Sequence, residues 1–194
     1  MGRPAKFGAD QILDAAAALA AEGGHEAVTV TAIAARLGAP SGSIYHRYAS
    51  RDLLLAHLWI RAVRRFQEGF LSAARVPDLA EAVRASAAHV VRWSAEHQDE
   101  ARLLLAHNVA ELRERWPDEL GEELDRLNVD ATAALRELAG RLPGDDALER
   151  VTFALVDVPV AAVRRHVLAG RTVPDSAVRL AEAAALAVVL ESDL

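Results

Sequence analysis

Cysteine is absent from this chain of 194 residues, and aromatic residues make up only 5% of it. Without cysteine the chain can form no disulfide and has no thiolate nucleophile or metal ligand. No apolar run is long enough to span a membrane, and the short polar N-terminus lacks the apolar segment of a signal peptide. We therefore expect a cytoplasmic protein that does not enter the membrane.

The sequence also lacks the signatures of common active sites. It has neither a Gly-x-Ser-x-Gly motif following a strand nor a glycine-rich phosphate loop. Its seven histidines do not occur at the spacing of a known metal motif. No strand-like alternation or internal repeat is present. These absences predict an all-α protein that is not an enzyme and has no cofactor or metal site.

Hydrophobic residues are plentiful, at 52%, and suffice for a sizeable core. The formal net charge of −6 is unevenly distributed along the chain. Residues 1–65 contain eight basic and five acidic residues, a net charge of +3, which leaves −9 for the remainder. A basic first third followed by an acidic remainder is typical of a chain that binds nucleic acid at one end. Ordinary scatter in composition would also explain it.

Residues 29–48 predict two short helices joined by a tight turn. Thr29 or Thr31 can cap the first helix, in which Ile33 and Leu37 lie on one apolar face. Gly38 is typical of a helix C-terminus, because glycine adopts positive φ without a steric penalty. Proline two residues later cannot continue the same helix, so a second helix must begin there.

The second helix of this pair predicts an inward and an outward face. Ser41 is its expected N-cap, and Ile44 and Tyr48, four residues apart, are expected to face the core. The outward residues are Ser43 and a His-Arg pair at 46 and 47, which can donate hydrogen bonds to DNA. Two short helices in this arrangement predict a helix-turn-helix.

The same segment resembles the TetR-like family of transcriptional repressors. The resemblance rests on Ile33-Ala34, Gly38, the run Ser41-Gly42-Ser43-Ile44-Tyr45-His46-Arg47-Tyr48, and Ser50-Arg51-Asp52 followed by Leu54. Two features depart from the family pattern: Ala39-Pro40 replaces an apolar residue and a serine, and Arg51 stands where lysine is common. By motif the resemblance covers about the first quarter of the chain.

The resemblance and the apolar spacing together predict two domains. Residues 1–50 are expected to form a three-helix DNA-binding domain, the head, and residues 51–194 a helical effector-binding and dimerisation domain, the body. A connector helix over 51–74 should join them, because its apolar stripe is too long for the head. We expect later helices at about 78–98, 100–115, 117–142, 145–170 with a kink or split at Pro159, and from Pro174 onward.

The expected DNA contacts lie in the head. In TetR-like proteins the tyrosine matching Tyr45 usually contacts the DNA backbone, although a core tyrosine is the plainer alternative. Arg51 and the start of the connector helix are expected to hold a phosphate. The full set of predicted DNA-binding residues is Arg3, Lys6, Thr29, Ser41, Gly42, Ser43, Tyr45, His46, Arg47 and Arg51.

The aromatic and polar residues of the body predict a cavity for a small effector. Pockets are mostly apolar with a few polar groups, although each of these residues taken singly is as well explained by an ordinary core. The predicted ligand-binding residues are Trp59, Phe66, Phe70, His89, Trp93, His97, His107, Asn108, Trp116 and Phe153.

The last two expected helices predict a dimer interface, because rows of small apolar residues allow close helix packing. Packing of the same rows within one chain is the alternative. The predicted interface residues are Val160, Val163, Val167, Ala177, Ala181, Ala184 and Val188.

The function implied by the resemblance is repression of transcription. A homodimer would bind a two-fold operator in double-stranded DNA and be released by a small molecule in the body. Two other hypotheses remain open at this point. The body could dock a protein partner instead of a small molecule, or the chain could be an uncatalogued enzyme fused to a DNA-binding head.

Overall fold

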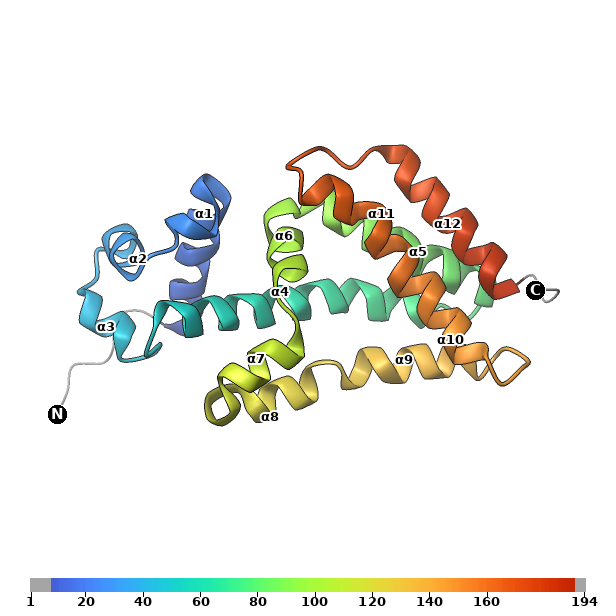
Figure 1. The fold of residues 1–194 in the computed structure, drawn as a ribbon, viewed down its shortest axis with the longest axis horizontal. Helices are drawn as coiled ribbons and strands as arrows, with labels where there is room; N and C mark the ends of the chain where they lie inside the picture. Colours follow the sequence, from blue (N-terminus) through green and yellow to red (C-terminus); the bar gives the residue numbers. More distant parts are fainter. Residues whose placement is uncertain (1–7, 191–194) are drawn as a thin grey trace.

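The computed structural model describes residues 8–190, and every regular element in that range is a helix (Figure 1). The predicted all-α fold is confirmed. Arg3 and Lys6, two of the predicted DNA contacts, lie outside the described residues. Among the described helices, none is both long enough and apolar enough to cross a membrane.

The head consists of α1 (Ala9–Ala27), α2 (Val30–Leu37) and α3 (Ser41–Tyr45). The backbone of α1 leaves helical geometry at Gly23 and Gly24. The Thr29 hydroxyl accepts from the Ala32 N–H and caps α2, and Gly38 closes α2 with a φ of 59°. Each boundary of α2 is thus set by the residue type that the local geometry requires.

The connector helix α4 (Arg51–Ala74) runs through the length of the molecule from head to body (Figure 1). The Ser50 hydroxyl accepts from the Leu53 N–H and caps its N-terminus. The core of the head contains Ile12, Ile33 and Ile44, and it continues into α4 through Leu54 and Leu58. The apolar core of the head therefore extends beyond residue 50 into the connector.

The body surrounds the remainder of α4. The helices α5 (Leu79–Glu96), α11 (Val158–Val167) and α12 (Asp175–Leu190) pack together on one side of α4, and α5 lies against both other helices (Figure 1). The helices α7 (Val109–Arg115), α8 (Pro117–Leu127) and α9 (Val129–Ala139) lie on the other side, and α6 (Gln98–Ala106) also contacts α4.

Two long helices predicted in the body are each divided in the structure. The helix expected at 100–115 breaks at Asn108, whose side chain accepts from the Glu111 N–H and caps α7. The helix expected at 117–142 breaks at Asn128 and ends at Ala139. Leucines on both sides of Asn128 still face inward, so the apolar stripe gave no sign of the break.

The helix expected at 145–170 runs without a break from Ala147 to Val167, and the irregularity predicted at Pro159 is a π turn just before the proline. The α10 segment (Ala147–Thr152) passes into a π turn, η1 (Phe153–Asp157), before α11 begins. In this wider turn the Val158 N–H bonds the carbonyl of Phe153, five residues earlier. Proline has no N–H and crowds the carbonyl four residues before it, and a π turn accommodates both effects.

Candidate nucleic-acid interface

The recognition helix α3 begins at Ser41, immediately after Pro40. The Pro40 carbonyl accepts from the Ser43 N–H at 3.0 Å and from the Ser43 hydroxyl at 2.7 Å. Pro40 is therefore the N-cap, and the expectation that Ser41 occupies that position is wrong by one residue. The fixed φ of proline suits the entry to a helix, and no capping side chain is needed.

The two faces of α3 and the residues after it follow the predicted pattern. Ile44 and Tyr48 are buried, with 0% and 5% of their surface exposed, whereas Tyr45 is 54% exposed. The side chains of His46 and Arg47 are exposed as well, and Ser43 is partly exposed. Burial raises the pKa of the Tyr48 hydroxyl, while the nearby Arg47 lowers it. The core thus holds α3 by Ile44 and Tyr48 and leaves the other residues facing solvent.

Gly42 and Thr29 have different local roles. A Cβ at Gly42 would meet nothing within 4 Å, so the protein core does not require glycine there. The absence of a side chain leaves space outside α3 for another backbone to approach. The Thr29 hydroxyl is already used as the cap of α2.

Arg51 points into the protein, unlike Arg47. Its Nε donates to the Val28 carbonyl at 2.6 Å, and its guanidinium lies 3.7 Å from the Asp52 carboxylate. It fastens the start of α4 to the segment between α1 and α2. The sequence predicted a phosphate contact for Arg51, and the structure gives its side chain this internal role.

Five of the predicted ligand-binding residues form one aromatic cluster between α4 and α5. The ring of Phe66 lies 5.3 Å from Trp93 and 6.1 Å from Phe70, and Trp93 stacks on His97 at 5.0 Å. The fifth member, His89, lies 5.2 Å from Phe66. These rings pack against one another and belong to the apolar core of the body.

His89 is fitted closely against α4. Its Nε2 lies 2.8 Å from the Phe66 carbonyl, where it can donate a hydrogen bond. A Cβ added to Gly69 would lie 2.2 Å from the His89 Cε1 atom, so only glycine allows this approach. Burial lowers the pKa of His89, which favours the neutral ring.

The other predicted ligand-binding residues lie apart from this cluster. Trp59 and Trp116 pack in a second core with the leucines of α7 and α8. Asn108 caps α7, and Phe153 is half exposed on the π turn. His107 lines a cavity of about 500 Å³ between α1, α4 and α6, and with Trp116 it lines a second cavity of about 280 Å³.

The predicted dimer residues are mostly internal. Val163, Val167, Ala177 and Ala181 are at most 4% exposed and pack around Val91 and Trp93 of α5. Val160 and Val188 are half buried against the neighbouring core, and Ala184 is also partly buried. The apolar rows of α11 and α12 face α5 of the same chain, which was the alternative considered from sequence.

A different apolar row of α12 faces solvent. Its residues recur at helical spacing, and Leu180 is 65% exposed. The row consists of Leu180, Ala183 and Leu190, which are exposed, and Ala187, which is partly buried. None of these four residues belongs to the predicted interface.

A three-helix head with a short exposed recognition helix, mounted on a long helix and an α-helical body, defines a helix-turn-helix DNA-binding protein. Residues 12–58 match the family model described as "Bacterial regulatory proteins, tetR family". The TetR-like resemblance inferred from sequence is confirmed by this match, which covers most of the head and the start of α4.

Solved structures share this fold over nearly the whole chain. A transcriptional regulator from Rhodococcus sp. RHA1 is 18% identical with a TM-score of 0.74, covering 95% of this chain and 97% of the other. A TetR regulator from Haloarcula marismortui is 18% identical with a TM-score of 0.69, covering 93% and 95%.

A third solved structure holds a ligand. FadR from Bacillus subtilis, in complex with stearoyl-CoA, is 18% identical with a TM-score of 0.66, covering 93% of this chain and 97% of FadR. Comparison with curated protein sequences gives no match.

Proposed function

We propose that the protein is a repressor that binds a two-fold operator as a homodimer and is released by a small molecule bound in the body. The observation that carries the proposal is the exposed face of α3 and the residues that follow it. There Tyr45, His46 and Arg47 project to solvent while Ile44 and Tyr48 anchor the helix in the head. A helix presented in this way fits the major groove.

The residues of the head divide by chemistry into two roles. Arg47 and the Tyr45 hydroxyl contact phosphates, which position the protein without selecting a sequence. Ser43 and His46 contact base edges, where each can donate or accept a hydrogen bond. Gly42 lets the DNA backbone approach the start of α3. Because Arg51 is engaged with Val28, its contribution to DNA binding is to fix the angle between α4 and the head.

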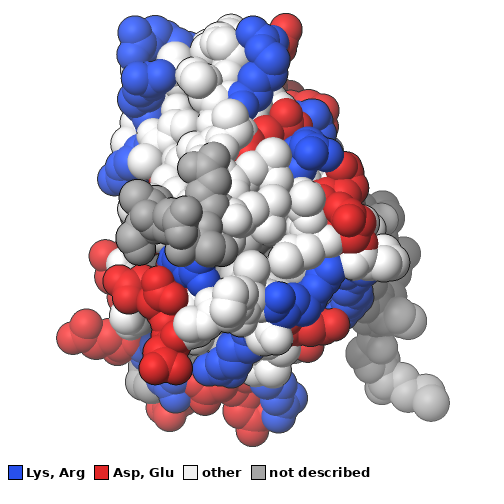
Figure 2. Space-filling model, turned by 90° about the vertical axis from the view of Figure 1, so that its right-hand side faces the viewer, with Lys and Arg blue, Asp and Glu red and all other residues white. Residues whose placement is uncertain are grey.

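Dimerisation would use the exposed row of α12, defined above by Leu180 and Leu190 and the alanines between them. One short recognition helix offers few base contacts, so specificity requires two heads on a symmetric site. Figure 2 views the end of the body opposite the head and shows charged side chains around a central uncharged area. An uncharged, self-complementary face is what a two-fold interface between bodies requires.

Release by a small molecule requires a cavity in contact with the elements that carry the head. The cavity of about 500 Å³ has the volume of typical ligand pockets and borders both α4 and α1. Of the predicted ligand-binding residues, His107 lines this cavity, whereas Trp116 lines the smaller cavity of about 280 Å³. That FadR, which shares the fold, was solved with stearoyl-CoA favours a small-molecule effector over a protein partner.

DNA binding by the head is tested with a salt titration. The affinity for duplex DNA should fall with salt, and Arg47→Ala should reduce the slope of log affinity against log salt by about one unit. Tyr45→Phe should weaken binding to all sequences alike, whereas His46→Ala should change the preferred sequence.

Arg92→Ala is a matched control for the salt titration, because this exposed arginine lies on α5 and pairs with Glu182, away from the head. For Arg92→Ala, the slope of log affinity against log salt should equal that of the wild type. If Arg47→Ala also had the wild-type slope, the proposed interface would be contradicted.

A further inference from the structure

The cavity between head and body is built from three helices that belong to different parts of the molecule. The head provides α1, the connector α4 and the body α6, with a contribution from the end of α11. Its volume of about 500 Å³ is enough for a small organic molecule. Most of the wall is aliphatic, contributed by Ala17, Ala20, Leu55, Leu58, Leu103, Ala106 and Leu168.

The charged residues at this cavity already have partners. The Arg51 guanidinium holds the Val28 carbonyl, and Asp52 pairs with Arg115 at 2.5 Å. The other pairs are Asp99 with Arg102 at 3.5 Å and Glu100 with Arg65 at 2.5 Å. The second carboxylate oxygen of Glu100, Oε2, has no hydrogen-bond partner, but it is buried and not exposed to the cavity. A charged ligand would therefore have to compete with one of these pairs and would lose its own hydration. An uncharged ligand can occupy the aliphatic wall and leave every pair intact.

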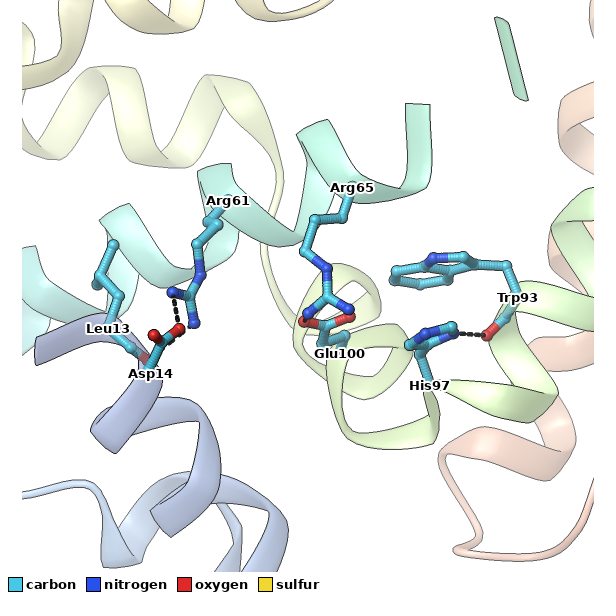
Figure 3. A network of polar contacts seen from close by, with 7 residues as sticks. All are labelled: Leu13, Asp14, Arg61, Arg65, Trp93, His97 and Glu100. Carbon is cyan, nitrogen blue, oxygen red and sulfur yellow. Dashed lines mark hydrogen bonds and ion pairs between the residues drawn. The ribbon is translucent and has the colours of Figure 1, made fainter. Parts of the chain in front are cut away.

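Two arginines of α4 explain why the space is not closed by collapse of the helices. Arg61 binds the Asp14 carboxylate at 2.7 Å and the Leu13 carbonyl at 2.8 Å, which fixes α1. Arg65, one turn further along α4, binds Glu100 of α6 (Figure 3). The two helices are therefore each attached to α4 by polar contacts. Leu103 of α6 also packs against the apolar core of the head, and the polar contacts hold α1 and α6 in place beside the cavity.

We infer that this junction cavity binds an uncharged, mostly apolar small molecule. The inference rests on the proposed function and gives its effector a place and a chemical class. A molecule seated there touches the head through α1 and the body through α6, so it favours the head position seen in this structure. It opposes any reorientation that DNA requires, and DNA and ligand must weaken each other's binding by the same factor.

Site occupancy is tested with three probes of equal chain length that differ in charge: octanol, octanoate and octylammonium. Octanol should raise the melting temperature, because a ligand specific for the folded state stabilises it. It should bind at least about tenfold more tightly than either charged probe. An equal or greater affinity for a charged probe, or no shift with octanol up to its solubility limit, would overturn the inference.

Two variants locate the binding site. Ala106→Phe fills the cavity from α6, where the alanine is exposed, and Ala20→Phe fills it from α1. Each should weaken octanol binding at least about tenfold. Ala133→Phe is the matched control, since this exposed alanine of α9 lies away from the cavity. If both filling variants bind octanol as well as the control does, the ligand sits elsewhere and the inference is wrong.

Coupling to DNA is measured on an operator selected by the protein from a random duplex pool. Saturating octanol should weaken operator binding by the wild type and the Ala133→Phe protein at least about fivefold, and should leave Ala106→Phe unchanged. If the wild type binds octanol but its operator affinity does not change, the regulatory part of the inference is refuted. Failure to select any operator would instead refute the proposed function, and the octanol measurements would still decide the cavity.

Discussion

The two ends of α4 are held by different kinds of contact. At the head end, Leu54 and Leu58 pack in the core of the head, arginines reach across to backbone carbonyls and carboxylates, and a cavity remains between α1 and α6. At the body end, aromatic rings pack against one another and His89 lies directly on Gly69. Close packing transmits small displacements, whereas polar attachment beside a cavity lets one element shift without disrupting a core. We therefore expect the free energy of unfolding to depend mainly on the body, and the head to be able to shift its position relative to the body.

The largest effect is expected from a charge in the body core. Val163→Glu places a carboxylate among Val91, Trp93 and Val167, where no partner is available, and should cost about 4 kcal/mol or more of folding stability.

Leu180→Glu alters the exposed row of α12 and should leave a folded chain that no longer dimerises. Melting curves and light scattering measure both. A folded monomer from Val163→Glu, or a stable dimer from Leu180→Glu, would contradict these assignments.

The next largest effect is expected from a change in the packing at Gly69. Alanine usually stabilises a helix by about 1 kcal/mol relative to glycine. At Gly69 the added Cβ would overlap His89, so Gly69→Ala should instead cost about 1–3 kcal/mol. Denaturant unfolding measures the difference.

Gly121→Ala is the control for Gly69, because a Cβ at this position of α8 meets nothing within 4 Å and should stabilise the protein. Removing the ring with His89→Ala should relieve the cost of Gly69→Ala. If both glycine variants were stabilised equally, the close approach of His89 would not be rigid.

Loss of the Arg61 contact should have a small effect on stability and a larger one on regulation. The pair with Asp14 is partly exposed, so Arg61→Ala should cost about 1 kcal/mol. Because the head is then less firmly attached, octanol should change operator affinity less than in the wild type.

Arg64→Ala is the matched control for Arg61, since Arg64 is a neighbouring arginine of α4 that pairs with Glu123 of α8 and not with the head. In Arg64→Ala, octanol should change the operator affinity as much as in the wild type. If octanol changed the operator affinity of Arg61→Ala and Arg64→Ala equally, the Arg61 contact would not link the ligand to DNA binding.

The smallest expected effect concerns two partly buried histidines, His57 on α4 and His89 on α5. Burial lowers the pKa of His57, where Glu123 opposes the shift, and burial lowers the pKa of His89 as well. The unfolded chain therefore binds these protons first, and stability should fall as the pH drops below about 6.5. Replacing either histidine with glutamine should flatten this part of the pH profile. A profile unchanged in both variants would show that neither ring loses hydration on folding.

Local residue chemistry made the head predictable from sequence. Thr29 as a cap, Gly38 at positive φ and the inward pair Ile44 and Tyr48 each specify their own geometry within a few residues. Pro40 gave an error at the start of α3, because proline can begin a helix without a capping side chain, and α3 ends at Tyr45 although the predicted helix included Tyr48. These signals need no knowledge of distant contacts.

The body was predictable in its helical character but not in its divisions or its contacts. Asn108 and Asn128 interrupt helices whose apolar stripes continue across the break, and asparagine is a weaker signal than glycine or proline. Asparagine at 108 followed by Glu111 is a capping pattern that would have located the first break. The contact between Arg61 and Asp14 has no local signal, because it joins residues 47 positions apart. The cavity between α1, α4 and α6 likewise has no local signal in the sequence.

The π turn before Pro159 has a consequence for the whole C-terminal half. Six buried residues before, within and after it are spaced four apart: Ala147, Val151, Leu155, Pro159, Val163 and Val167. In a regular α-helix each step of four overshoots a full turn by about 40°, so five steps would carry the row about 200° round the axis. The additional residue in the π turn takes back about 100°, and the rest fits within one apolar face.

The five residues Phe153–Asp157 thus correct the phase of a long helix. If the same residues formed a regular α-helix, α11 would be rotated by about 100° against α10, and Val163 and Val167 would turn away from α5. The π geometry of this short turn therefore decides which side of α11 faces its own chain and which side remains for a second copy.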